Sequence, residues 1–127
     1  MVASALRGAG ERVVVHDDAF DDDATDIEWL GAAGKKRWVV LTKDARIRTN
    51  ALERGALLTA GVAAFMLGRG DVNGARMASA FVKSLSAMKK ALRRWDVPMI
   101  GTVSIDGAVS MLYIDGARLR QARRVKA

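Results

Sequence analysis

Short apolar runs alternate with helical patterns along the chain and predict strands and helices in turn. The runs typical of buried strands lie at residues 13–15, 38–41 and 62–67. The patterns typical of helices lie at residues 3–10, 26–33, 51–59 and 72–94. Strands that alternate with helices favour an α/β fold with a mainly parallel sheet.

The segment 72–94 carries the strongest helical pattern. Its large apolar residues recur at spacings of three or four, as expected for one face of a helix: Met77, Phe81, Leu85, Met88 and Leu92. We therefore predict that this face belongs to the hydrophobic core.

After Pro98 the pattern changes to that of a hairpin. Residues 99–104 and 108–113 flank Asp106-Gly107, a pair favoured in two-residue hairpin turns. The last residues, 116–127, are rich in bases and are predicted to form a flexible tail. Residues 1–115 are predicted to form one domain.

Composition narrows the class of protein. The chain has 127 residues, half of them hydrophobic, which suits one globular domain with a real core. It has no cysteine, which excludes disulfides and thiol chemistry and is compatible with a reducing compartment. No apolar stretch approaches the ~20 residues needed to cross a bilayer. We expect a soluble cytoplasmic domain that does not act in a membrane.

The net charge of +7 conceals a strong asymmetry. Residues 1–28 hold eight acids and two bases, a balance of −6, whereas residues 29–127 hold nineteen bases and six acids, a balance of +13. Clustered carboxylates can bind hard divalent cations, and a basic surface attracts polyanions. Two different functions are therefore predicted for the two parts of the chain.

Three acids are predicted to lie near the carboxyl ends of strands, where ligands bind in open α/β sheets. Asp44 follows the strand that ends at Leu41, while Asp26 and Glu28 open the helix after the strand at 13–15. Oxygen ligands without histidine or cysteine suit Mg²⁺ or Mn²⁺, and the matching chemistry is hydrolysis of phosphodiester bonds.

Each of these acids also has a structural explanation. Glu28 completes a capping box with Thr25, and Asp26 in a first helical turn is favoured by the helix dipole. Asp44 has the alternative role of capping the segment that follows its strand. Both interpretations stay open on the residues alone.

Two motifs resemble a known family. The segments TDIEWL at 25–30 and WVVLTKDARI at 38–47 look like the paired motifs of PIN-like domains, most of all the VapC-type toxin group. The apolar run near residue 62, the long helix and the closing hairpin also fit, so the resemblance covers residues 3–114.

The resemblance implies a Rossmann-like α/β/α sandwich with a C-terminal hairpin and a metal-dependent ribonuclease activity. Matched by motif, Asp26 and Asp44 take the places of metal-binding acids, Glu28 is a third, and Thr42 supplies a hydroxyl beside the site. It further implies Mg²⁺ or Mn²⁺, an RNA substrate, a cognate antitoxin protein and a homodimer.

Three bases lie next to the acidic motif and are predicted to contact nucleic acid. They are close to Asp44 in the chain, where positive charge would steer a phosphate backbone toward the metal: Lys43, Arg46 and Arg48.

One departure from the family pattern has two explanations. The family opens with a strand that ends in an aspartate, whereas Met1 here falls inside the first helix. Either the working protein is longer, or the chain is a degenerate form with little catalysis. The second explanation predicts a non-catalytic module that binds RNA or an acidic protein. A receiver-type phosphate-handling domain is disfavoured, because no predicted strand ends with an acid in the required context.

Overall fold

A computed structural model describes residue 35 and residues 39–42, 51–67 and 74–125. It contains two described helices, α5 (Ala51–Ala60) and α6 (Gly74–Arg94). The strands are β1 (Val39–Thr42), β2 (Ala63–Leu67), β3 (Met99–Val103), β4 (Val109–Ile114) and β5 (Ala117–Val125). Neither helix in these ranges is both long and apolar enough to span a bilayer.

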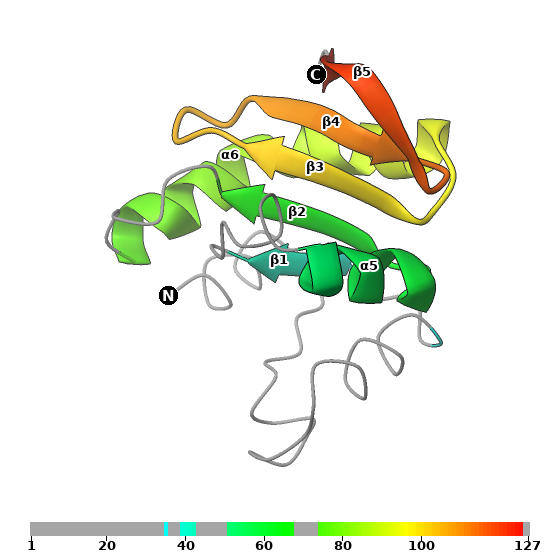
Figure 1. Ribbon diagram of the computed structural model, residues 1–127. Coiled ribbons are helices and arrows are strands. Elements are labelled where there is room, and N and C mark those ends of the chain that lie inside the picture. Colours follow the sequence, from blue (N-terminus) through cyan, green and yellow to red (C-terminus); the bar gives the residue numbers. More distant parts are fainter. Residues whose placement is uncertain (1–34, 36–38, 43–50, 68–73, 126–127) are drawn as a thin grey trace, which may run out of the picture.

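The strands form one sheet in the order β1-β2-β3-β4-β5 (Figure 1). The first three strands run parallel, and β4 and β5 continue the sheet in antiparallel fashion. This arrangement confirms the predicted α/β fold with a parallel part and a C-terminal hairpin. The strands and helices expected at 38–41, 51–59, 62–67 and 72–94 are each present within two residues of the predicted bounds.

The two helices cover opposite faces of the sheet (Figure 1). Successive side chains of a strand point to opposite faces, so Phe65 packs with α6 while Ala64 and Met66 pack with α5. Because β2 is covered on both sides, all five of its residues are buried. That burial explains its unbroken apolar sequence and the layered α/β/α arrangement.

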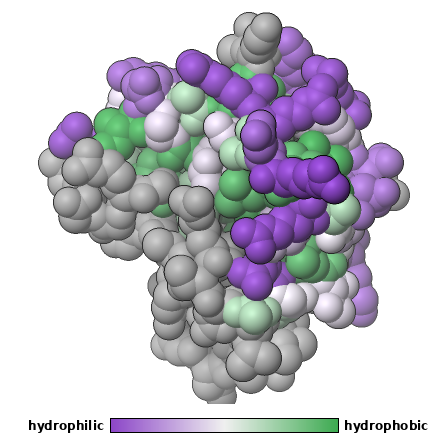
Figure 2. Space-filling model, turned by 45° about the horizontal axis from the view of Figure 1, so that its top comes forward, coloured by the Kyte–Doolittle hydropathy of each residue, from purple (hydrophilic) through white to green (hydrophobic). Residues whose placement is uncertain are grey.

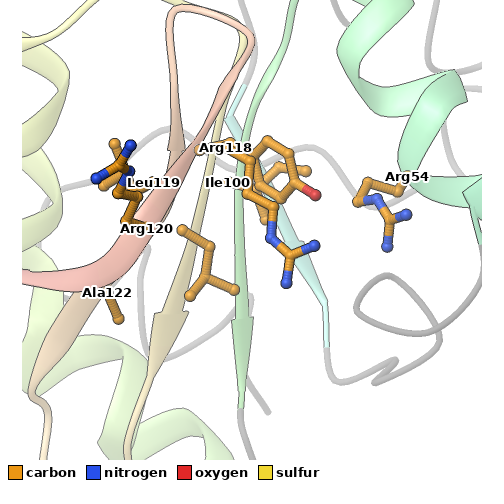
Figure 3. A pocket seen from close by; sticks show the side chains of 8 residues that line it. Arg54, Ile100, Arg118, Leu119, Arg120 and Ala122 are labelled. Atoms are coloured by element: carbon orange, nitrogen blue, oxygen red, sulfur yellow. The ribbon is translucent and has the colours of Figure 1, made fainter.

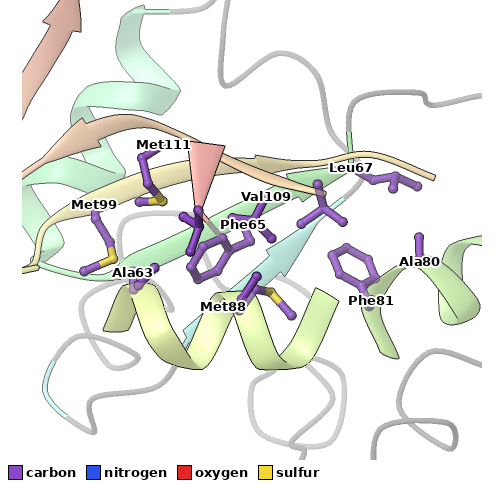
Figure 4. Close-up of a cluster of buried hydrophobic side chains, with 13 residues drawn as sticks. Ala63, Phe65, Leu67, Ala80, Phe81, Met88, Met99, Val109 and Met111 are labelled. Carbon is purple, nitrogen blue, oxygen red and sulfur yellow. The ribbon is translucent and has the colours of Figure 1, made fainter. Parts of the chain in front are cut away.

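The predicted core face of α6 is confirmed. Phe81 and Met88 are almost fully buried against the sheet (Figure 4). Met77, Leu85 and Leu92 are partly buried and pack against the same cluster. Small residues on the same helix let its backbone approach the strands closely: Ala78, Ala80, Ser84, Ala87 and Ala91. The buried Ser84 hydroxyl donates to the Phe81 carbonyl oxygen at 3.0 Å and so leaves no unpaired polar atom.

The turn between β3 and β4 differs from the predicted two-residue turn. The Gly107 N–H donates to the Ser104 carbonyl, the Ser104 N–H donates to the Ala108 carbonyl, and only Gly107 has a positive φ, of 92°. These bonds define a three-residue loop with a glycine bulge rather than a tight type I′ turn. A Cβ at Gly107 would also lie 2.7 Å from Lys83 Cβ, so the close approach of α6 requires glycine here.

The prediction of a flexible C-terminal tail is wrong for residues 117–125. They form β5, which pairs with β4 at both of its ends, through residues 117–118 and 123–125. Asp115 and Gly116 make the connecting turn with φ of 51° and 76°, the left-handed pair that a two-residue hairpin requires. Leu119 and the buried Val125 pack against the core on the α6 side and hold the strand in place.

Several predicted elements lie outside the described residues. These are the helical end at 3–10, the strand at 13–15 and the helix at 26–33. They stay predictions. The predicted boundary at residue 115 does not end the fold, because β5 continues the same sheet beyond it.

Candidate functional site

Most of the predicted catalytic and RNA-binding residues lie outside the described part of the chain. This applies to the acids Asp26, Glu28 and Asp44 and to the bases Lys43, Arg46 and Arg48. Within the described ranges, no three histidine, cysteine or acidic side chains gather closely enough to hold a metal ion. The proposed ligands are all carboxylates, and carboxylate oxygen is the donor that Mg²⁺ and Mn²⁺ prefer.

The structure does place Thr42, which is the last residue of β1. Thr42 pairs with Met66 on β2, Met66 pairs with Thr102 on β3, and Thr102 pairs with Ser110 on β4. These positions form one row near the carboxyl ends of the parallel strands. β1 ends in this row, two residues before Asp44 in the sequence. Open α/β sheets bind their ligands at this edge.

The same row ends on an arginine that sequence analysis assigned to a tail. Ser110 pairs with Arg124 on β5, so Arg124 lies at the same level of the sheet as Thr42 and on the α5 side. Thr102 and Ser110 are also linked directly, because the Thr102 hydroxyl reaches the Ser110 carbonyl oxygen at 3.5 Å. The row of paired residues therefore runs across the sheet from Thr42 on β1 to the positively charged Arg124 on β5.

Alternation along β5 sorts its arginines onto two faces. Arg118 pairs with Tyr113, which packs with α5, so Arg118 and the alternate residues Arg120 and Arg124 lie on the α5 side. All three side chains are exposed. Three positive charges therefore line one side of a single strand.

A pocket of about 220 Å³ lies beside Arg118 and Arg120 (Figure 3). Arg118 and Arg120 reach it from β5 and Arg54 reaches it from α5. The remaining lining is mainly apolar, with one aromatic ring: Ile100, Leu112, Tyr113, Leu119 and Ala122. Figure 2, in which the β5 side comes forward, shows hydrophilic side chains lying across apolar surface. The site combines cationic donors with an aromatic ring, and sequence reasoning missed it.

The other face of β5 is fixed by an aromatic side chain at the end of α6. The guanidinium carbons of Arg94 and Arg123 lie 5.1 Å and 5.4 Å from the centroid of the Trp95 ring. Cations over an indole face are attracted by its quadrupole. Arg123 is thereby engaged on the α6 side, which separates it from Arg118, Arg120 and Arg124.

Asp106 is an acid in the β3–β4 loop that lies near two bases. A hydrogen bond from the Ser104 hydroxyl lowers the pKa of the Asp106 carboxyl below its usual 3.8, with smaller contributions from its own backbone N–H and from Arg124 and Lys83. The Ser104 hydroxyl also accepts from the Ala108 N–H at 3.0 Å. The ionised carboxylate therefore supports the loop.

We expect a small acid-induced loss of stability that depends on Asp106. Folding lowers the pKa of the Asp106 carboxyl. Its contribution to the free energy of unfolding is therefore complete above pH 3.8, the pKa in the unfolded chain, and disappears as the pH falls through the lower pKa of the folded protein. Asp106 is fully exposed, so the effect is minor. An NMR titration of the side-chain carboxyl should give a midpoint below 3.8, and Ser104→Ala should raise it. A midpoint that Ser104→Ala leaves unchanged would assign the shift to another cause.

Comparison with known proteins gives two matches. A family model described as PIN like domain matches residues 1–69, just over half of the chain. A curated protein named Putative ribonuclease VapC45, from Mycobacterium tuberculosis (strain ATCC 25618 / H37Rv), is 30% identical over 115 residues, which covers 87% of this chain and 83% of that protein.

No solved structure matches the chain significantly. The family match includes both acidic motifs and β1, and the relative extends the similarity over most of the chain, in agreement with the α/β sheet described above. The chain therefore belongs to the PIN-like domain family, and within it to the VapC-type group.

Proposed function

We propose that this protein is a metal-dependent ribonuclease, the toxin of a VapBC-type toxin–antitoxin pair, which hydrolyses RNA phosphodiester bonds with metal-activated water. The observation that carries the proposal is the family match over residues 1–69, which contains both acidic motifs. The name of the relative, a putative ribonuclease, points to the same chemistry. The position of Thr42 at the carboxyl edge of the sheet supports a site there.

Each proposed site residue has a chemical role. Asp26, Asp44 and Glu28 would hold Mg²⁺ or Mn²⁺ through carboxylate oxygens. The bound cation would lower the pKa of water and stabilise negative charge on the phosphate. Thr42 would place a hydroxyl beside the ligands.

Three further residues would bring the substrate to these acids. Lys43, Arg46 and Arg48 would bind phosphates on either side of the bond that is cut, since RNA binding is largely electrostatic. A cognate antitoxin protein, a homodimer and a cytoplasmic location complete the proposal.

Cation dependence tests the catalytic part of this proposal. The purified chain, free of any antitoxin, is incubated with labelled single-stranded RNA in Mn²⁺, in Mg²⁺ or in EDTA. We expect cleavage products with Mn²⁺ or Mg²⁺ and none in EDTA, because without the cation no activated water forms.

Two results would contradict ribonuclease chemistry of this kind. Cleavage that persists in EDTA would exclude the metal mechanism. Intact RNA in Mn²⁺, bound as tightly as in EDTA, would favour the alternative of a non-catalytic RNA-binding module. The observation that motivates this alternative is the row of arginines on one face of β5, a basic surface that would need no metal to bind RNA.

A further inference from the structure

We propose that the α5 side of the β4–β5 hairpin is a second RNA-binding surface, which holds single-stranded RNA through Arg118, Arg120 and Arg124 and stacks a base on Tyr113. We call this set of residues the hairpin face. The inference rests on the proposed ribonuclease function for its choice of ligand. It names binding residues other than Asp26, Asp44 and the bases next to Asp44 in the sequence.

The charge of the hairpin face selects a polyanion. Arg118 and Arg120 are two residues apart on an extended strand, roughly 7 Å along it, a separation that suits adjacent phosphates of an extended nucleic acid. Among the described residues, no acidic side chain lines the pocket that they border. Guanidinium groups bind phosphate in bidentate fashion, which makes arginine well suited to this ligand.

The aromatic ring favours nucleic acid over other polyanions. Tyr113 is half-buried, pairs with Arg118 across the strands and lines the pocket together with Leu112 and Leu119. Proteins that bind single strands combine a basic track with aromatic side chains on which bases stack. An acidic peptide would use the arginines but would gain nothing from a stacking ring.

The position of the hairpin face fits a path toward the proposed catalytic site. Arg124 ends the row of paired residues that begins at Thr42, and Arg118 lies further along β5, away from that edge. A strand bound along β5 would therefore run toward the edge where the chain continues to Asp44. This surface would hold RNA on one side of the cleavage site and contribute to affinity rather than to the chemical step.

The test measures RNA binding without cleavage. A fluorescent single-stranded RNA is titrated with the full chain in EDTA at several salt concentrations. Arg118→Gln combined with Arg120→Gln should weaken binding about tenfold or more and reduce the slope of log affinity against log salt by about 1.4, the value for two lost phosphate contacts. The matched control is Lys90→Gln with Arg93→Gln, which removes the same charge from exposed positions of α6. This control should change affinity less than about threefold.

Tyr113 variants test the stacking contact separately. Tyr113→Leu should weaken binding at least about fivefold, whereas Tyr113→Phe, which keeps the ring, should bind as the parent does. Circular dichroism and thermal unfolding show that each variant is folded before binding is compared. If Tyr113→Leu binds as well as Tyr113→Phe, no base stacks there and the proposal fails.

Other outcomes also decide the question. Equal losses in the β5 and α6 double variants would mean that only net charge matters, and would overturn the proposal. Displacement of RNA by a poly-glutamate peptide of equal charge, as efficient as displacement by unlabelled RNA, would identify an acidic-peptide site instead. Because binding is measured in EDTA, a chain that binds RNA through β5 but never cleaves it refutes the proposed ribonuclease and leaves this inference intact. If the parent cleaves RNA normally and the β5 variants bind RNA as tightly as the parent, this inference fails and the proposed ribonuclease stands.

Discussion

Replacement of Phe65 by alanine should lower the free energy of unfolding by about 3–5 kcal/mol, the range for loss of a buried aromatic side chain. Phe65 is fully buried at the middle of β2, between α6 and the sheet (Figure 4). Total stabilities of domains are about 5–15 kcal/mol, so the variant would lose a large part of its stability. Urea unfolding followed by circular dichroism measures the change. Val97→Ala, at a residue that is 48% exposed, is the control and should stay within about 0.5 kcal/mol of the parent.

The reason for so large an effect is a specific fit between neighbouring strands. Phe65 pairs with Gly101 on β3, and a Cβ built at Gly101 would lie 3.0 Å from the Phe65 ring and 3.0 Å from the Met111 sulfur. The ring thus occupies the space that the glycine leaves open. Gly101→Ala should destabilise the parent but be better tolerated beside Phe65→Ala, which a double-mutant cycle measures as coupling. A cost of Phe65→Ala below about 1 kcal/mol would show that the surrounding side chains refill the space.

The hydrophobic pattern predicted those parts of the fold that are buried on a defined face. The apolar run of β2 and the three- and four-residue spacing of α6 are direct consequences of burial, so periodicity found both. The helix predicted over 51–59 ends at Ala60, where Gly61 takes the left-handed φ of 71° that closes a helix. Exact bounds shifted by one or two residues, as hydrogen bonding at element ends dictates.

The edge strand β5 was missed because its stabilising contacts do not produce an apolar pattern. Only Leu119 and Val125 pack into the core, and Arg123 is engaged by the ring of Trp95 rather than by a hydrophobic neighbour. Arginine-rich strands look like solvated tails by composition. The turn Asp115-Gly116 was nevertheless a usable signal, because Asp-Gly between extended segments is typical of a hairpin.

The candidate site divides into metal-binding acids, which stay predictions from the sequence, and the hairpin face, which sequence reasoning missed. The motifs predict Asp26 and Asp44 as metal ligands, because both are carboxylates and both follow predicted strands, where α/β sheets bind ligands. The hairpin face depends on register instead. Arg118 comes to lie beside Tyr113 only through the pairing of β4 with β5, and that pairing shifts between Met111 and Tyr113 at an irregularity. Such a shift is invisible in composition.

Asp44→Asn should reduce the rate of RNA cleavage in Mn²⁺ on the order of a hundredfold or more, because it replaces a charged metal ligand by a neutral amide of the same size. Single-turnover cleavage at saturating protein isolates this effect from binding. Asp96→Asn is the matched control, since Asp96 is exposed just after α6 and lies outside both motifs. It should cleave at the rate of the parent.

The charge change at Asp44 separates catalysis from substrate affinity. Removal of a negative charge lowers the repulsion of phosphate, so Asp44→Asn should bind RNA in EDTA at least as tightly as the parent. Slow cleavage with unweakened binding therefore assigns Asp44 to the chemical step. Cleavage by Asp44→Asn at the parental rate would show that Asp44 is not a metal ligand. Its alternative role, capping the segment that follows β1, would then explain this residue. Asp26→Asn, tested in the same way, should match Asp44→Asn, because two ligands of one cation fail together.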